Sequence, residues 1–85
     1  MSLDTRVPFS VVVGTIQGWP DIAPNVRSFE VAAAPVGGEV IIIDGSGEKP
    51  PPPDALAKRT QWISTPGTSV FQGRYQGYRL ARGAM

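Results

Sequence analysis

The amino-acid sequence predicts an α/β fold built on a three-stranded parallel sheet. Two β-branched apolar runs, residues 9–13 (FSVVV) and 39–44 (EVIIID), have the composition of buried strands. Residues 60–64 (TQWIS) form a shorter third candidate strand. One helical pattern separates the first two strands and another follows the third. Because crossovers between parallel strands are right-handed, this order favours a βαβ-β-α arrangement.

Turn-forming residues separate the first strand from the first helix. The apolar run ends at Gly14, where we expect the strand to stop. Asp21 is a candidate N-cap, and Pro35 followed by Gly37 and Gly38 is a typical helix end. The apolar residues between these limits fall on one helical face, at spacings of 4, 3 and 4: Ile22, Val26, Phe29 and Ala33.

The second strand and the loop after it differ sharply in composition. Four consecutive apolar residues predict that the strand is buried on both faces of the sheet. Residues 47–57 form a proline-rich loop, with prolines at all of 50–53, which regular secondary structure does not accommodate. Residues 54–59 have room for one helical turn. Two explanations of the proline run are open: a stiff linker, or a polyproline II ligand for an aromatic groove.

The final helix has two distinct faces. Thr68 or Ser69 can cap it, and we expect it to run from about Val70 to residue 82. One face carries Phe71, Tyr75, Tyr78 and Met85, and the other carries Gly73, Gly77, Ala81 and Ala84. Each glycine costs about 1 kcal/mol of helix propensity relative to alanine. The small face is therefore expected to pack closely against a neighbour or a ligand.

Composition limits the classes of function. The 85 residues have room for a single domain, and the net charge of +1 gives no overall attraction to nucleic acid or anionic lipid. The absence of cysteine and histidine excludes disulfides, thiolate metal sites and a histidine base. No apolar run is long enough for a membrane span and the N-terminus lacks a signal-peptide pattern, so we expect a cytoplasmic protein.

Candidate binding residues follow the predicted strands, because ligands of open parallel sheets bind beyond the carboxyl ends of the strands. These ends are at Thr15, at Asp44 and Gly45, and at residues 65–67. Two interpretations of Asp44 are open. Its carboxylate can accept a hydrogen bond from a ribose hydroxyl or a base N–H, or it can close an Asx turn with Gly45. Thr15 can likewise donate to a base carbonyl or cap a turn.

The remaining polar and aromatic residues give weaker indications. Arg74 lies near the start of the final helix, where a guanidinium can reach a phosphate or a base. Arg79 and Arg82 suit a solvated cationic face at the helix C-terminus. Trp19 and Trp62 are predicted to pack in the core or in a lid. Neither GxGxxG nor GxxxxGK[ST] occurs, which disfavours a dinucleotide or P-loop site.

Three blocks of the sequence resemble motifs of glycosyltransferase family 2, which has the Rossmann-like GT-A fold. Residues 10–17 read SVVVGTIQ where the family has a pattern like SVVIPTYN. Residues 43–47 read IDGSG and look like the family's VDDGS or VDGGS, and residues 73–83 read GRYQGYRLARG and look like ARNxGxxxARG. The resemblance covers about residues 8–83.

This resemblance implies nucleotide-binding roles for four residues. Thr15 matches the threonine near the uracil, Asp44 and Gly45 match the nucleoside-binding block, and Arg74 matches the arginine of the third block. The chain departs from the family at Gly14, Ile16, Gln17 and Tyr75, which replace a proline, an aromatic residue and two asparagines. It also has one acidic residue in the second block where the family often has two.

The resemblance further implies that residues 1–85 are a partial domain that binds a UDP-type nucleotide-sugar. The family's DxD motif, which holds Mn²⁺ or Mg²⁺ with the sugar diphosphate, has no counterpart here, and neither does the acceptor half. We therefore expect no cofactor, no catalytic residue and no sugar transfer by this chain alone.

Two other functions are open. One is a non-catalytic α/β assembly or binding module that oligomerises through its exposed sheet, since three strands leave edges that need covering. The other is a proline-motif interaction peptide on a small scaffold. A chain this short buries only about 60–65% of the surface of its unfolded state, so we expect a homo-oligomer.

Overall fold

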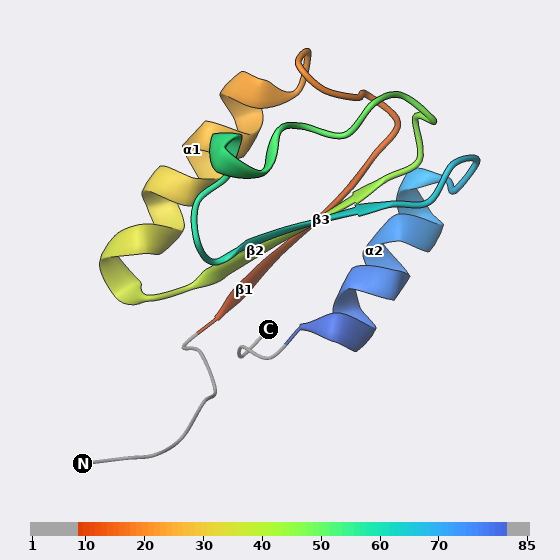
Figure 1. Cartoon of the computed structure of the whole chain (residues 1–85). Helices are drawn as coiled ribbons and strands as arrows, with labels where there is room; N and C mark the ends of the chain where they lie inside the picture. The colour runs from red at the N-terminus through yellow and green to blue at the C-terminus, as the bar shows by residue number, and fades with distance from the viewer. Residues whose placement is uncertain (1–8, 82–85) are drawn as a thin grey trace.

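The computed structural model describes residues 9–81 and places one parallel sheet between two helices (Figure 1). The elements in chain order are β1 (Ser10–Thr15), α1 (Ala23–Ala33), η1 (Ala34–Val36), β2 (Glu39–Asp44), η2 (Pro53–Ala55), β3 (Thr60–Ser64) and α2 (Val70–Leu80). The sheet has three strands in the order β1-β2-β3, and both strand pairs are parallel. This arrangement confirms the predicted α/β fold class with its three-stranded parallel sheet.

The central strand β2 is buried along its whole length, as its apolar run predicts. Ile41, Ile42 and Ile43 are each at most 1% exposed. The buried carboxylate of Glu39 accepts a 2.5 Å hydrogen bond from the Ser10 hydroxyl on β1. The edge strand β1 is only half-buried at its centre, which differs from the burial expected for it.

Helix α1 covers one face of the sheet with the apolar stripe that its spacing predicts. Ile22, Val26 and Ala33 are almost fully buried and form the core cluster with Val40 and Ile42 of β2. Partly buried apolar side chains complete this layer: Phe9, Val11, Val13, Trp19, Phe29, Leu56 and Trp62. The predictions that Phe29 lies on the packed face and that both tryptophans pack against the core are confirmed.

Helix α2 covers the opposite face through its glycines. Gly73 and Gly77 are buried, and a Cβ added at Gly77 would lie 2.2 Å from Cγ1 of Val12. A Cβ added at Gly73 would lie 3.1 Å from the Cα of Gly14. The close approach that the two glycines predict is therefore made with β1 and not with a ligand.

Two element boundaries differ from the prediction. Strand β1 continues through Gly14 to Thr15, because ladder pairing with β2 extends to that point. Helix α1 has Ile22 as its N-cap with no side-chain cap, so Asp21 is not the cap. Backbone bonds from Ile22 N to Gly18 O (3.0 Å) and from Ala23 N to Pro20 O (2.9 Å) form the entry turn instead.

The connections otherwise follow the turn chemistry of the sequence. After α1 the chain continues through the 3₁₀ turn η1 and ends it at Gly37, whose φ of 71° is in the left-handed region. The helical turn expected at 54–59 is a 3₁₀ turn at Pro53–Ala55. Ser69 caps α2 as predicted. Within residues 9–81, no helix is both long and apolar enough to cross a bilayer.

Candidate functional site

The carboxyl ends of the three strands meet at one edge of the sheet. Thr15, Asp44 and Ser64 are register neighbours there, one from each strand. The loops that leave this edge continue the pairing for one or two residues. Gly45 N donates to Thr15 O (2.8 Å), Thr65 N donates to Asp44 O (2.8 Å), and Gly67 N donates to Gly45 O (3.1 Å). The edge is therefore held by backbone bonds on both sides of Asp44.

Asp44 is the buried acidic residue of this edge, with an exposed fraction of 1%. Its Oδ1 accepts a 2.8 Å hydrogen bond from Ser46 N, which closes an Asx turn. Its Oδ2 is buried and has no hydrogen-bond partner among the described residues. The Asx-turn interpretation of Asp44 is thus correct for Oδ1, and Oδ2 has no hydrogen-bond partner among the described residues.

The Thr65 hydroxyl is a second unsatisfied group at the same edge. Its Oγ1 is buried and makes no hydrogen bond within residues 9–81. Thr65 follows β3 directly and is tied to Asp44 by its backbone N–H. Burying a polar group without a partner costs about 1–3 kcal/mol, and native interiors contain few such groups. Both unsatisfied groups belong to residues of the carboxyl edge, which makes this edge the strongest candidate site in the described chain.

Thr15 has a local structural role. Its Oγ1 accepts from Gln17 N (2.9 Å) and donates to Gln17 O (3.1 Å), so the hydroxyl closes a turn after β1. The turn-capping interpretation of Thr15 is therefore realised. Its position beside Asp44 keeps the residue at the candidate site, although its hydroxyl is already engaged.

Gly45 is required by close packing at this edge. A Cβ added there would lie 1.9 Å from the carbonyl oxygen of Thr68, in the loop before α2. This contact brings the N-terminus of α2 to the carboxyl edge of the sheet. The first turn of the helix is internally capped, because Ser69 Oγ accepts from Gln72 N and Ser69 N donates to the Gln72 side chain, both at 3.2 Å.

Arg74 is placed near the edge by its backbone. Gly14 directly precedes Thr15 on β1, and a Cβ added at Gly14 would lie 3.0 Å from Arg74 N. The Arg74 side chain is exposed. Among the described residues, no hydrogen bond or ion pair joins it to Asp44 or to Thr15. The structure thus brings Thr15, Asp44 and Gly45 together and leaves the Arg74 side chain exposed on α2.

Two loops meet beside Asp44. A Cβ added at Gly18, in the β1–α1 loop, would lie 2.7 Å from Ser46 Oγ and 3.1 Å from Glu48 Cβ. Ser46 Oγ also accepts from Glu48 N at 3.1 Å. The backbone N–H of the same Ser46 donates to Asp44 Oδ1, so the contact between Gly18 and Ser46 adjoins the carboxylate. Because Oδ2 is buried, a ligand reaches it only if the surrounding residues move.

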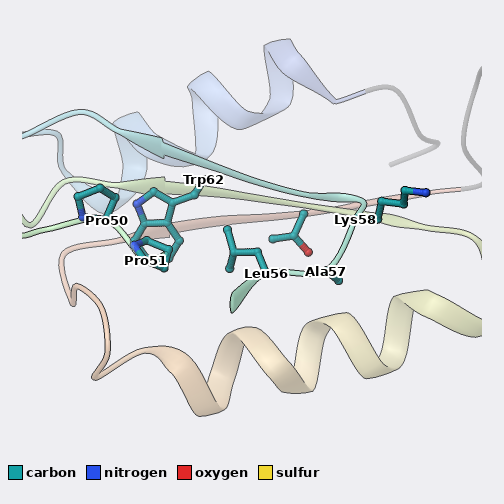
Figure 2. Close-up of a pocket in the computed structure, with 7 residues that line it drawn as sticks. Pro50, Pro51, Leu56, Ala57, Lys58 and Trp62 are labelled. Carbon is teal, nitrogen blue, oxygen red and sulfur yellow. The ribbon is translucent and has the colours of Figure 1, made fainter. Parts of the chain in front are cut away.

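A separate hollow lies on the α1 side of β3 (Figure 2). It has a volume of about 610 Å³ and is lined by Pro50, Pro51, Leu56, Ala57, Lys58, Thr60 and Trp62. Figure 2 shows Pro50 and Pro51 beside the Trp62 ring, with Lys58 extending away from them. The Trp62 ring also meets Trp19 edge-on, with centroids 6.1 Å apart. Pro51 is buried, so this part of the proline run is packed into the domain.

Residues 65–67 were predicted as a strand end, but no binding role was predicted for Thr65, and the hollow at Trp62 was not predicted. The hollow depends on the proline loop folding back onto β3, and no local pattern predicts that return.

Neither a metal-ligand cluster among the described residues nor a comparison with known proteins assigns a function to this site. Within residues 9–81, no group of three acidic, histidine or cysteine side chains lies close enough to hold a metal ion. The class defined by fold and edge is a small parallel α/β domain with a candidate ligand site beyond its strands. No known family, curated protein or solved structure matches the chain.

Proposed function

We propose that this chain binds a UDP-type nucleotide or nucleotide-sugar at the carboxyl edge of its sheet, as the nucleotide-binding part of a glycosyltransferase-like protein. The observation that supports this most is the buried, unpartnered Oδ2 of Asp44. It lies where ligands of open parallel sheets bind. The motif resemblance at Thr15, Asp44, Gly45 and Arg74 supplies the ligand class.

The chemistry of the edge fits a nucleoside. An ionised carboxylate accepts hydrogen bonds only, so Oδ2 requires a donor such as a ribose hydroxyl or the uracil ring N–H. The Thr65 hydroxyl both donates and accepts, which suits a second ribose hydroxyl or a base carbonyl. Each partner that the ligand supplies removes an unsatisfied buried group, and that gain offsets part of the cost of opening the edge.

Arg74 is the proposed contact for the diphosphate. Its exposed guanidinium has the five donors and permanent charge that suit bidentate phosphate binding. The described residues provide no carboxylate cluster for a divalent cation, so the proposed binding does not depend on Mg²⁺. Sugar transfer is not part of the proposal, because no catalytic group is assigned in this chain.

The test is an NMR titration of the ¹⁵N-labelled chain with UDP, with and without Mg²⁺. We expect saturable shifts at the amides of Thr15, Asp44, Thr65 and Arg74, equal in both buffers. Asp44→Ala should abolish these shifts while keeping a dispersed spectrum. Asp21→Ala is the matched control, because Asp21 is an exposed carboxylate at the far end of the β1–α1 loop.

Uridine provides a second comparison. Because Arg74 is assigned to the diphosphate, Arg74→Ala should weaken UDP binding about tenfold and leave uridine binding unchanged. A folded chain with no shifts at millimolar UDP would exclude the proposal. Equal shifts in the wild-type chain and in Asp44→Ala would move the site away from the carboxyl edge.

An assembly module is the second candidate function. It is favoured by the open sides of the sheet, because β1 and β3 are both edge strands among the described residues. Edges of this kind can pair with another chain. Light scattering tests it: a single molecular mass across a wide concentration range would exclude self-assembly.

A further inference from the structure

The last residues of the three strands form a polar row on one face of the sheet. Thr15, Asp44 and Ser64 are register partners, and directly paired residues point their side chains to the same face. Two positions earlier in the same strands, the side chains belong to the layer that packs with α1: Val13, Ile42 and Trp62. Because side chains alternate along a strand with a period of two, the polar row also lies on the α1 face.

The three side chains of this row differ in what they have left to offer a ligand. The Thr15 hydroxyl is engaged with the backbone of Gln17 as donor and as acceptor. Asp44 Oδ2 is a buried acceptor without a partner among the described residues. Ser64 Oγ accepts from the Trp62 indole N–H at 3.3 Å, but within residues 9–81 its own O–H donates to no acceptor. The row thus presents one available acceptor, at Asp44, beside one available donor, at Ser64.

The position of Ser64 opens the row to a ligand at one end. Ser64 is exposed and belongs to β3, an edge strand among the described residues, whereas Asp44 on the central strand is only 1% exposed. Neighbouring strands lie about 4.7–4.9 Å apart, so one small ring can contact both side chains. A ligand that reaches the carboxylate from the β3 side therefore passes the Ser64 hydroxyl.

An acceptor beside a donor selects a ligand that carries a donor beside an acceptor. Uracil has this pattern, because its ring N3–H lies between two carbonyl groups. With N3–H donating to Asp44 Oδ2, a neighbouring carbonyl can accept from the Ser64 O–H. Cytosine has an unprotonated N3 and an amino group at C4. In the same ring position, its N3 lone pair would face the carboxylate and its amino group would leave the Ser64 O–H without an acceptor.

We infer that Ser64 is a base-selecting residue of the proposed nucleotide site, where its hydroxyl donates to a uracil carbonyl beside Asp44. This inference rests on the proposed function and adds to it a preference for uracil over cytosine. Ser64 lies outside the three blocks that resemble family motifs, at residues 10–17, 43–47 and 73–83. The register of the sheet and the unused O–H are therefore the observations that indicate it.

A purely structural role for Ser64 predicts a different result. If its hydroxyl only held the Trp62 indole, removing it would change the local packing without regard to the base. The affinities for uracil and cytosine nucleotides would then fall by the same factor. The ratio of the two affinities separates base selection from packing, because a site built to hydrogen-bond one group discriminates against an analogue that lacks it.

Calorimetric titration of the 85-residue chain with UDP and with CDP tests the inference. We expect the wild type to bind UDP at least tenfold more tightly than CDP. Ser64→Ala should weaken UDP binding about fivefold, the effect of one neutral hydrogen bond, and leave CDP binding unchanged. A dispersed amide spectrum checks that each variant is folded.

Two further variants serve as controls. Ser64→Thr keeps the hydroxyl and should keep the preference for UDP. Ser28→Ala is the matched control, because Ser28 is an exposed serine of α1 whose hydroxyl donates to Pro24 O. Its affinities for UDP and CDP should both equal those of the wild type.

The outcomes distinguish the inference from the proposed function. If the wild type binds UDP but Ser64→Ala has the same ratio of UDP to CDP affinity, the inference is wrong and the proposed function stands. A wild type that binds UDP and CDP equally well would have the same meaning. A folded wild type that binds neither nucleotide would overturn the proposed function, and the inference with it.

Discussion

The carboxylate of Asp44 is used only partly by the fold. An ionised carboxylate offers about four acceptor positions, and Asp44 receives one hydrogen bond, from Ser46 N, within the described residues. A smaller side chain at this position would avoid a buried oxygen that has no partner. Residues that serve a ligand often lower the stability of the free protein in this way.

Because the fold uses only one of the two carboxylate oxygens of Asp44, removing this side chain should cost little stability. Asp44→Ala loses the Ser46 bond, worth about 1–3 kcal/mol, but also removes the unsatisfied oxygen, so the two changes nearly cancel. We expect its free energy of unfolding to lie within about 1 kcal/mol of the wild type in urea denaturation. Ile42→Ala, at a fully buried apolar site of the same strand, should cost about 2–5 kcal/mol. A similar loss for both variants would mean that Oδ2 is structurally engaged.

At the scale of elements, the packing of α2 on β1 depends on the missing side chain of Gly77. Alanine there gains about 1 kcal/mol of helix propensity. However, its Cβ would lie 2.2 Å from Val12 Cγ1, and overpacking of this kind costs about 1–3 kcal/mol. We expect Gly77→Ala to lower the thermal midpoint, and the double variant with Val12→Ala to recover most of the loss.

The matched control is Gly67→Ala. A Cβ added at Gly67 meets nothing within 4 Å, so its cost of about 1–2 kcal/mol comes only from the left-handed backbone, with φ at +86°. Because this cost does not involve Val12, adding Val12→Ala should not rescue it. Rescue of both glycine variants would indicate a general effect of the valine change and not a contact with Gly77.

The elements were predictable where a single periodic pattern decided them. Strand β2 and the buried face of α1 follow from runs and spacings that have one interpretation. The end of β1 was not predictable, because Gly14 is a turn former by propensity, and its place in the strand depends on β2 pairing. The absence of an Asp21 cap has a similar cause: the entry turn of α1 is made by backbone bonds that depend on the path of residues 18–22.

Across the whole molecule, the sequence located the candidate edge but not all of its chemistry. Asp44 was predicted from its position after a buried strand, and the topology brought Thr15 and Gly45 to it. The other features of the edge depend on contacts between segments far apart in the chain. They are the unpartnered Oδ2 of Asp44, the unpartnered Thr65 hydroxyl and the contact between Gly18 and Ser46 among the described residues. The small face of α2 was predicted to pack closely, but its neighbour, β1, depends on the tertiary fold.

The candidate site joins all three strands, so ligand binding there is expected to stabilise the whole domain. Ligand that binds only the folded chain raises its stability by RT ln(1 + [L]/Kd), about 1.4 kcal/mol at ten times Kd. We expect UDP to raise the thermal midpoint of the wild type and of Asp21→Ala equally, because Asp21 is an exposed carboxylate away from the carboxyl edge. The thermal midpoint of Asp44→Ala should not respond to UDP. An equal rise in Asp44→Ala would instead assign nucleotide binding to a part of the chain other than the carboxyl edge.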